Sequence, residues 1–226
     1  MKKRIGIVTA MVVCVFISQA QEKGGVEWGI RGGVNFQNVN GKDVSGNQLK
    51  NDMITAYHAG LTAAFPIVQD FYIQSGVLYS VKGTKSDQEF SGLPLKGTVR
   101  ISYVEIPFSL LYKPMLGKGH LVMGFGPYVA WGVGGTIKNI TGPLNQNLDL
   151  EFKNTVRVTD PVTAVYYRSF DAGGNLLFGY EMRNKVSVQL NAQMGFIKIN
   201  PEYESKVNDR SSFKNTGFGL SVGYRL

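Results

Sequence analysis

The side chains best suited to catalysis or metal binding are few in this sequence. The 226-residue chain has two histidines, His58 and His120, and a single cysteine, Cys14. The histidines fall on different predicted strands near opposite ends of those strands, so a metal site or a proton relay that uses both is not expected. His58 with Ser45 or Asp52 is the one candidate pairing of a nucleophile or carboxylate with a base, and the spacing of these residues does not favour it.

Phosphate and thiol chemistry are not expected either. No glycine-rich loop ending in Gly-Lys-Ser or Gly-Lys-Thr occurs, and Gly124, Gly126, Gly132 and Gly134 lie in a strand pattern with no helix after it. Cys14 lies in a segment that we expect to be removed, which would leave no thiol for a disulfide or a metal. The sequence therefore predicts no catalytic, cofactor-binding or metal site, and a protein that is not an enzyme.

Residues 1–20 have the order of a secretory signal peptide. Three cations without an anion precede the apolar run from Ile5 to Ile17, and Ser18-Gln19-Ala20 places small residues where signal peptidase requires them. Cleavage after Ala20 would leave residues 21–226 as one domain and, by loss of three cations, lower the formal net charge from +8 to +5. Acylation of Cys14 is a weaker alternative, because the preceding Val13 is not small. Export also excludes nucleic acid as a partner.

The remaining chain predicts an all-β fold. The full sequence contains 28 glycines and 12% aromatic residues, and the part after Ala20 shows recurring period-2 alternation with no apolar stretch long enough for a membrane helix. The predicted strands are 26–37, 54–66, 71–84, 97–113, 119–137, 163–180, 184–199 and 212–226. Short turns alternate with long polar loops at 38–53, 85–96, 138–162 and 200–211. An eight-stranded antiparallel up-and-down transmembrane β-barrel has this arrangement, with short turns on the side of both termini.

The last predicted strand indicates which face meets lipid. Phe218, Leu220, Val222 and Tyr224 alternate with glycine, Ser221 and Arg225. An eight-stranded barrel has an interior only just wide enough for ordinary side chains, so the large apolar set cannot all point inward. We therefore expect the apolar face to point outward into lipid; a soluble barrel that encloses a ligand is the less favoured alternative.

Aromatic residues on the outward face fall near the two ends of the strands. Such placement is typical of the aromatic girdles at the two membrane interfaces. The predicted girdle residues are Trp28, Phe71, Tyr112, Tyr180 and Tyr224 at the end with the termini, and Phe36, Tyr79 and Trp131 at the opposite end.

Several charged residues have the inward parity. They are Glu27, Arg31, Glu105, Asp171, Glu181 and Arg225. An unpaired charge in a narrow interior costs several kcal/mol, so these residues should pair. Arg31 and Arg225 are the expected partners of Glu105, because the first and last strands close the barrel. A salt-bridged plug is the favoured interpretation, and a water-filled, ion-selective pore is the alternative.

The chain resembles a family of small outer-membrane β-barrels common in Bacteroidetes, usually labelled porin family or PorT-like. The resemblance rests on WGIRGGVNF (28–36), FYIQSGVLYSVKGTK (71–85), SYVEIPFSLLYK (102–113), GFGPYVAWGVGG (124–135), FDAGGNLLFGYEM (170–182) and GFGLSVGYRL (217–226). It implies localisation in the bacterial outer membrane and little chemistry. Such barrels usually end in an aromatic residue that the barrel assembly machinery recognises, whereas this chain ends in Leu226.

The expected role is structural or interaction-based, through the outer loops. A small-solute porin and a component of a secretion machinery are the alternatives. The expected partners are outer-membrane lipids and the assembly machinery. A cationic excess at Lys82, Lys85, Lys96 and Arg100, near Asp87 and Glu89, is a candidate contact for anionic lipopolysaccharide.

Overall fold

In the computed structural model, the described residues are 25–86, 89–90, 93–94, 97–139, 147–161, 164–204 and 209–226. The predicted signal peptide, residues 1–20, lies outside them. The long strands are β1 (Glu27–Lys42), β3 (Ile54–Val68), β4 (Phe71–Ser86), β7 (Gly97–Tyr112), β9 (Gly119–Asn139), β13 (Phe170–Glu181), β14 (Val186–Gly195) and β16 (Ser212–Arg225). The short strands are β2 (Asn51–Asp52), β5 (Glu89–Phe90), β6 (Leu93–Pro94), β8 (Met115–Leu116), β10 (Asn147–Phe152), β11 (Thr155–Val156), β12 (Val165–Tyr167) and β15 (Glu202–Tyr203).

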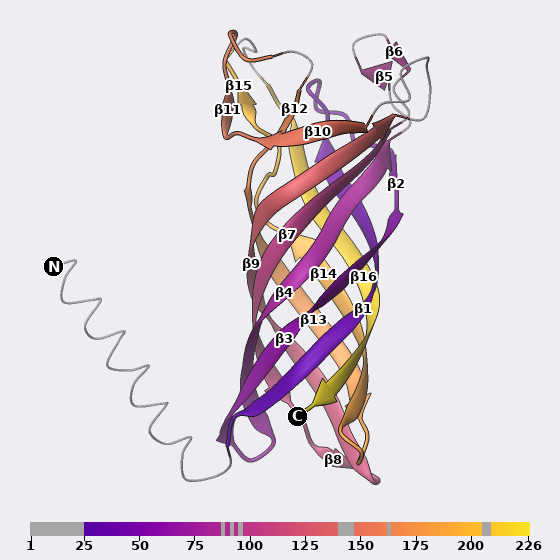
Figure 1. The fold of residues 1–226 in the computed structure, drawn as a ribbon, viewed down its shortest axis with the longest axis vertical. Coiled ribbons are helices and arrows are strands. Elements are labelled where there is room, and N and C mark those ends of the chain that lie inside the picture. The colour runs from indigo at the N-terminus through magenta and orange to yellow at the C-terminus, as the bar shows by residue number, and fades with distance from the viewer. Residues whose placement is uncertain are drawn as a thin grey trace, which may run out of the picture.

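The eight long strands form a closed antiparallel barrel, as the alternation predicts. Each pairs with the next long strand along the chain, and β1 closes the barrel on β16 from Gly29 opposite Arg225 to Lys42 opposite Ser212. In Figure 1 the start of β1 and the C-terminus lie at the lower end, with the β8 turn, and the short strands β10, β11, β12 and β15 lie at the upper end. We call these the turn end and the loop end.

Each tight connection at the turn end contains a residue in the left-handed region. Asp70, Gly117 and Lys185 have φ values of 63°, 64° and 68°. Glycine adopts this conformation without steric cost, and aspartate tolerates it better than most residues. These connections are the short turns that the sequence predicts.

The loop end departs from the predicted strand limits. The sixth long strand begins at Phe170 rather than at residue 163, because Val165–Tyr167 form β12, which pairs in parallel with β10. The seventh ends at Gly195 rather than at 199, and Ile199 instead bonds through its N–H to the carbonyl of Phe213. Segments that the sequence assigns to the wall therefore turn away from it at this rim.

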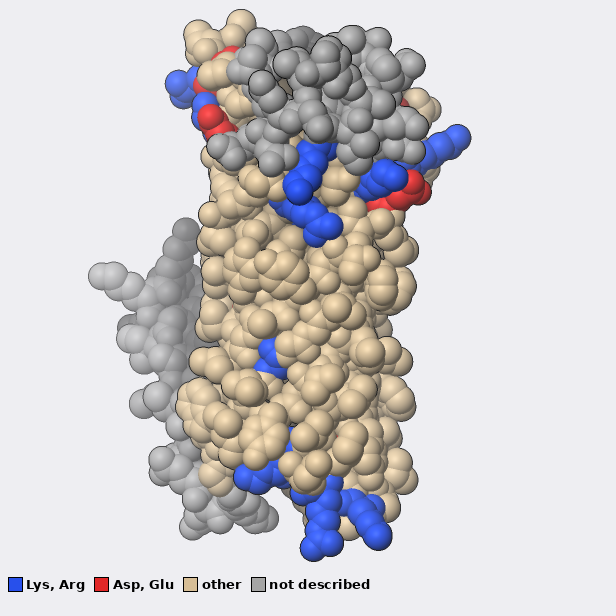
Figure 2. All heavy atoms as spheres, turned by 45° about the vertical axis from the view of Figure 1, so that its right-hand side comes forward, with Lys and Arg blue, Asp and Glu red and all other residues tan. Residues whose placement is uncertain are grey.

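The outer wall is apolar. Along β16, Phe218, Leu220 and Val222 are exposed, whereas Ser221 between them is completely buried. Figure 2 shows a wall of almost wholly uncharged residues between cationic side chains near the loop end and at the turn end. No helix among the described residues is long and apolar enough to cross a membrane. The outward direction of the apolar face agrees with the alternation of the sequence.

An apolar cluster closes the barrel at the loop end. Tyr103 and Tyr128 from the wall pack there, fully buried, with Leu150, Tyr167 and Ile199 from the outer segments. The wall also contributes Val39, Ile101 and Ala130. The outer segments thus cover the mouth of the barrel, above the polar groups of its interior.

Candidate functional site

A group of three charged side chains lies in the interior just below the cap. The Lys82 ammonium is 2.8 Å from Glu105 Oε2 and 3.3 Å from Asp171 Oδ2, and all three side chains are almost completely buried. Gln193 donates to Glu105 Oε1 at 2.6 Å, and the Tyr128 hydroxyl donates to Asp171 Oδ2 at 3.2 Å. We call Lys82, Glu105 and Asp171 the upper cluster. One cation therefore serves two carboxylates, which lie on β7 and β13, the two strands that flank β9.

Aromatic rings and an amide complete the environment of the upper cluster. The Lys82 ammonium lies 3.9 Å from the centroid of the Tyr128 ring and 5.5 Å from that of Tyr103. Asn215 donates to Asp171 Oδ2 at 2.9 Å. A cation over a ring face in a dry site gains electrostatic stabilisation, so these tyrosines offset part of the cost of removing Lys82 from water.

A second ion-pair cluster occupies the turn end of the interior. Lys113 lies 2.7 Å from Glu27 and 3.0 Å from Glu181, and Arg225 lies 2.9 Å from Glu181 and 3.5 Å from Glu27. Two cations and two carboxylates thus alternate in a closed network. We call these four residues the lower cluster.

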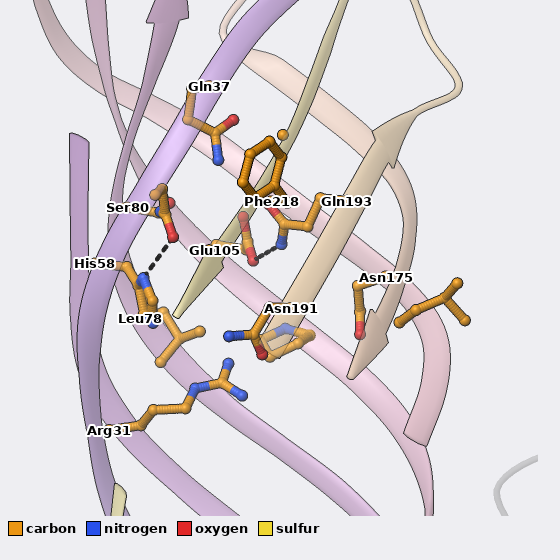
Figure 3. Close-up of a pocket in the computed structure, with 15 residues that line it drawn as sticks. Arg31, Gln37, His58, Leu78, Ser80, Glu105, Asn175, Asn191, Gln193 and Phe218 are labelled. Carbon is orange, nitrogen blue, oxygen red and sulfur yellow. Dashed lines mark hydrogen bonds between the residues drawn. The ribbon is translucent and has the colours of Figure 1, made fainter. Parts of the chain in front are cut away.

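Arg31 lies between the two clusters. It borders a cavity of about 30 Å³ on the loop side and another of about 50 Å³ on the turn side. Its one hydrogen bond among the described residues goes to Gln189 Oε1 at 3.4 Å, and its Nε has no partner there. Figure 3 shows the guanidinium pointing toward Asn191 across the first cavity. Each cavity has room for only a few water molecules.

The described interior is electrically balanced as a whole. The upper cluster has one cation against two carboxylates, the lower cluster has two of each, and Arg31 supplies the remaining positive charge. Arg31 thus offsets the surplus carboxylate above it without a direct ion pair, through a low-dielectric interior in which charges interact over longer distances.

The predicted pairing of Glu105 with Arg31 or Arg225 is wrong. Glu105 pairs with Lys82, while Arg225 belongs to the lower cluster. Sequence reasoning missed Lys82 and Lys113 as interior cations. The signal was present in both: Lys82 has the parity of buried Leu78 and Ser80 in β4, and Lys113 continues the buried parity of Glu105 beyond β7.

The buried place of Lys82 also corrects the proposed lipopolysaccharide contact. Lys82 is 0% exposed and cannot contribute to an outer cationic patch. Of the other members, Lys85 is half-buried and the Arg100 guanidinium donates to the carbonyl of Thr55, while Lys96 and Asp87 lie outside the described residues and so does the side chain of Glu89. Lys82 therefore does not belong to the predicted patch.

His58 lies inside the wall rather than beside Ser45 or Asp52. Its ring nitrogens contact Asn35 Oδ1 at 2.8 Å and Ser221 Oγ at 2.9 Å. Ser221, His58 and Asn35 are thus arranged like the nucleophile, base and orienting group of a catalytic triad. The adjoining cavity of about 30 Å³ has no room for an acyl substrate, so the arrangement serves to satisfy buried polar groups.

The second histidine is remote from the first. His120 lies at the turn end, opposite Glu181 in the β9–β13 pairing, far along the barrel from His58. Across the described part of the chain, no three His, Cys, Asp or Glu side chains are grouped in a way that could hold a metal ion.

The predicted girdle residues line the outer wall. Trp28, Phe71, Tyr112, Tyr224, Phe36, Tyr79 and Trp131 are exposed, and Tyr180 is half-buried with its hydroxyl on the carbonyl of Leu116. Neighbouring strands bring aromatic rings into contact, with centroids 4.7 Å apart for Phe71 and Tyr112 and 5.6 Å apart for Trp131 and Phe170. Such cross-strand ring pairs stabilise the pairing of the strands that carry them.

Comparison with known proteins gives a family match and fold-level likenesses. A family model described as outer membrane protein beta-barrel domain matches residues 18–200. Among solved structures, the chain is similar to Ail, the attachment invasion locus protein of Yersinia pestis, crystallised with the heparin analogue sucrose octasulfate (12% identity, 90% of this chain and 100% of that chain, TM-score 0.41). It is also similar to Neisserial surface protein A (10% identity, 90% of this chain and 100% of that chain, TM-score 0.43). A third similar structure is the outer membrane protein OprG from Pseudomonas aeruginosa (14% identity, 88% of this chain and 95% of that chain, TM-score 0.44). No curated protein matches the chain.

Proposed function

The chain belongs to the family of outer membrane protein β-barrel domains, and from this premise we propose that it is a non-conducting, non-enzymatic barrel that acts through its outer segments. Residues 1–20 serve as the export signal, and the barrel assembly machinery inserts the mature chain. Within the family, the sequence stretches quoted above favour the porin-family, PorT-like group of the Bacteroidetes.

The observation that supports a non-conducting barrel is the filling of its interior. A buried ion-pair cluster around Lys82 and a partly exposed one around Lys113 lie at different heights, and the apolar cap lies above them. Between the clusters remain cavities of about 30 and 50 Å³. A hydrated ion needs a continuous water path, and the packed tyrosines of the cap leave it no room.

The outer segments are then the part of the chain available to partners. They have secondary structure of their own, in β10, β11, β12 and β15, and these elements are tied to one another by parallel pairing and to the rim by hydrogen bonds. Such ordered segments on a rigid barrel are well suited to recognition, because little conformational entropy is lost on binding.

Single-channel recording tests the proposal. The purified protein, inserted into a planar bilayer in 1 M KCl, should give no unitary conductance steps above the baseline. Insertion is checked independently by reconstituting the protein into vesicles of the same lipids and measuring its protection from added protease. Stable steps with cation or anion selectivity would favour a small-solute pore instead.

A further inference from the structure

A hollow opens on the outside of the loop end, between the β11–β15 pair and the top of β13. Its volume is about 640 Å³, and it is lined by Asn154, Thr155, Arg168, Phe170, Ile197, Lys198 and Glu202. In Figure 1 the β11–β15 pair stands at the upper edge of the barrel, above the wall strands. The hollow is therefore at the level where the apolar wall gives way to polar loops.

Its walls are fixed by backbone hydrogen bonds. Thr155 pairs with Glu202 in the parallel β11–β15 ladder, and the Glu202 N–H donates to the carbonyl of Asn154 at 2.9 Å. The Arg168 N–H donates to the carbonyl of Ile199 at 2.8 Å. The hollow is thus a built feature of the rim, with its shape determined before any ligand arrives.

The charged groups that line the hollow leave a positive surplus. Arg168 and Lys198 both pair with Glu202, at 2.9 and 3.2 Å, so two cations share one carboxylate. Hydrogen bonds from Lys198 and Arg168 lower the pKa of Glu202, which keeps it ionised. The Arg168 Nε is buried and has no hydrogen-bond partner among the described residues. A ligand in the hollow cannot reach this shielded Nε, but the Arg168 side chain is 24% exposed, and a guanidinium has five N–H donors, more than the single carboxylate of Glu202 can use.

The floor of the hollow is continuous with the lipid-facing wall. Phe170 is 40% exposed, and its ring contacts Trp131, which is 44% exposed. Phe196, one residue before Ile197, is also exposed. A ligand with an anionic head and apolar chains would satisfy both parts, since its head would meet the cations while its chains lay on these rings.

We propose that this hollow binds the phosphate-bearing headgroup of a membrane lipid, with Arg168 and Lys198 facing the phosphate and the acyl chains lying along Phe170 and Trp131. The site differs from the predicted patch at Lys85 and Arg100, and it does not depend on whether the barrel conducts. It would anchor the outer segments to the membrane surface at one side of the rim.

Tryptophan quenching by brominated lipids tests the proposal. The chain has two tryptophans, Trp28 and Trp131, so Trp28→Phe leaves a single reporter beside the hollow. This variant is reconstituted into vesicles of phosphatidylcholine in which either dibrominated phosphatidylglycerol or dibrominated phosphatidylcholine is introduced at equal fractions. We expect Trp131 to prefer the anionic lipid by roughly fivefold, the effect of one cation near a membrane surface.

Substitutions separate charge from structure. In the Trp28→Phe background, Arg168→Gln with Lys198→Gln should bring the preference close to 1. Glu202→Gln removes the competing carboxylate and should raise the preference. Lys118→Gln with Lys185→Gln, which removes two cations at the turn end, should leave it unchanged.

Three results would overturn the proposal. The first is equal quenching by the two brominated lipids in the Trp28→Phe protein. The second is a preference that survives Arg168→Gln with Lys198→Gln, or that falls in Glu202→Gln. The third is loss of the preference in 10 mM inorganic phosphate at constant ionic strength, which would assign the hollow to a free phosphate ion rather than to a lipid.

Discussion

Lys82 on β4 forms an ion pair with Glu105 on the neighbouring strand β7, 2.8 Å away and shielded from solvent on every side. The residue directly opposite Lys82 in the ladder is Ile101, and the residue opposite Glu105 is Leu78. The pair is therefore diagonal, and the length of the lysine side chain lets it span the offset. It also brings the Lys82 ammonium to Asp171, from a strand that is not adjacent to β4.

Glu105→Gln should destabilise the barrel. It removes one partner of a buried pair and leaves the interior with a surplus cation, at a cost on the order of 3 kcal/mol, near the lower end of the usual range because Asp171 remains beside Lys82. Urea unfolding from detergent micelles measures the change. In a double-mutant cycle, Glu105→Gln should be non-additive with Lys82→Met and additive with Arg225→Met. Coupling to Arg225 and not to Lys82 would contradict the upper cluster.

Leu220→Arg should impair insertion into lipid. Leu220 is exposed on the apolar wall, where a cation near the bilayer midplane costs about 2 to 4 kcal/mol. Met115→Arg is the matched control, because Met115 is 76% exposed at the tip of the turn end. The fraction folded in phosphatidylcholine vesicles, measured by heat-dependent gel mobility, should fall for Leu220→Arg alone. An equal fall for both would speak against the face assignment.

Phe152→Ala should loosen the cap without opening the wall. The Phe152 ring lies so close to Gly132 that a Cβ at that glycine would have no room. Removing the half-buried ring should cost about 2 kcal/mol locally, so hydrogen exchange across residues 147–161 should accelerate by roughly 30-fold. Exchange in β1 and β16 should not change. Val158→Ala, at a residue that is 76% exposed, should leave the cap as it is.

The loop ion pair between Lys153 and Asp160 should make the cap sensitive to pH. The Lys153 Nζ lies 2.8 Å from Asp160 Oδ1. Hydrogen bonds from the Lys153 side chain and from the Arg157 N–H lower the pKa of Asp160. The hydrogen bond to Asp160 raises the pKa of Lys153. The contribution of Asp160 is present above its unfolded pKa and is lost as pH falls through its lowered value. That of Lys153 is present below its unfolded pKa and is lost as pH rises through its raised value.

Hydrogen exchange of residues 151–161, corrected for the intrinsic pH dependence, should therefore be slowest between about pH 5 and 9. Asp160→Asn should abolish the increase in exchange rate that the wild type shows at acid pH. A wild-type profile without that increase would show that the pair contributes nothing to the order of the cap.

Cleavage after Ala20 is expected when the chain is exported. The intact mass of protein extracted from membranes should correspond to residues 21–226, because residues 1–20 have the charge, apolar run and small residues of a signal peptide. Retention of Met1, or a lipid on Cys14, would count against the prediction.

The sequence alone determined the wall of this protein. In a strand, successive side chains point to opposite faces, so the alternation around Leu220 and Ser221 assigns one face to lipid and the other to the interior without knowledge of any partner. The same rule identifies the inward position of Glu105, and it could have identified Lys82. The short turns and the number of strands follow from the same local pattern.

Only the tertiary structure decided which charges meet. Whether Glu105 reaches Lys82, Arg31 or Arg225 depends on the offset between strands and on the width of the barrel, and neither is encoded in the alternation of a single strand. The cap is decided in the same way. Leu150 lies outside the predicted strands and Ile199 at the end of one, and both become buried because the closed rim offers them an apolar mouth that exists only once all eight strands have paired.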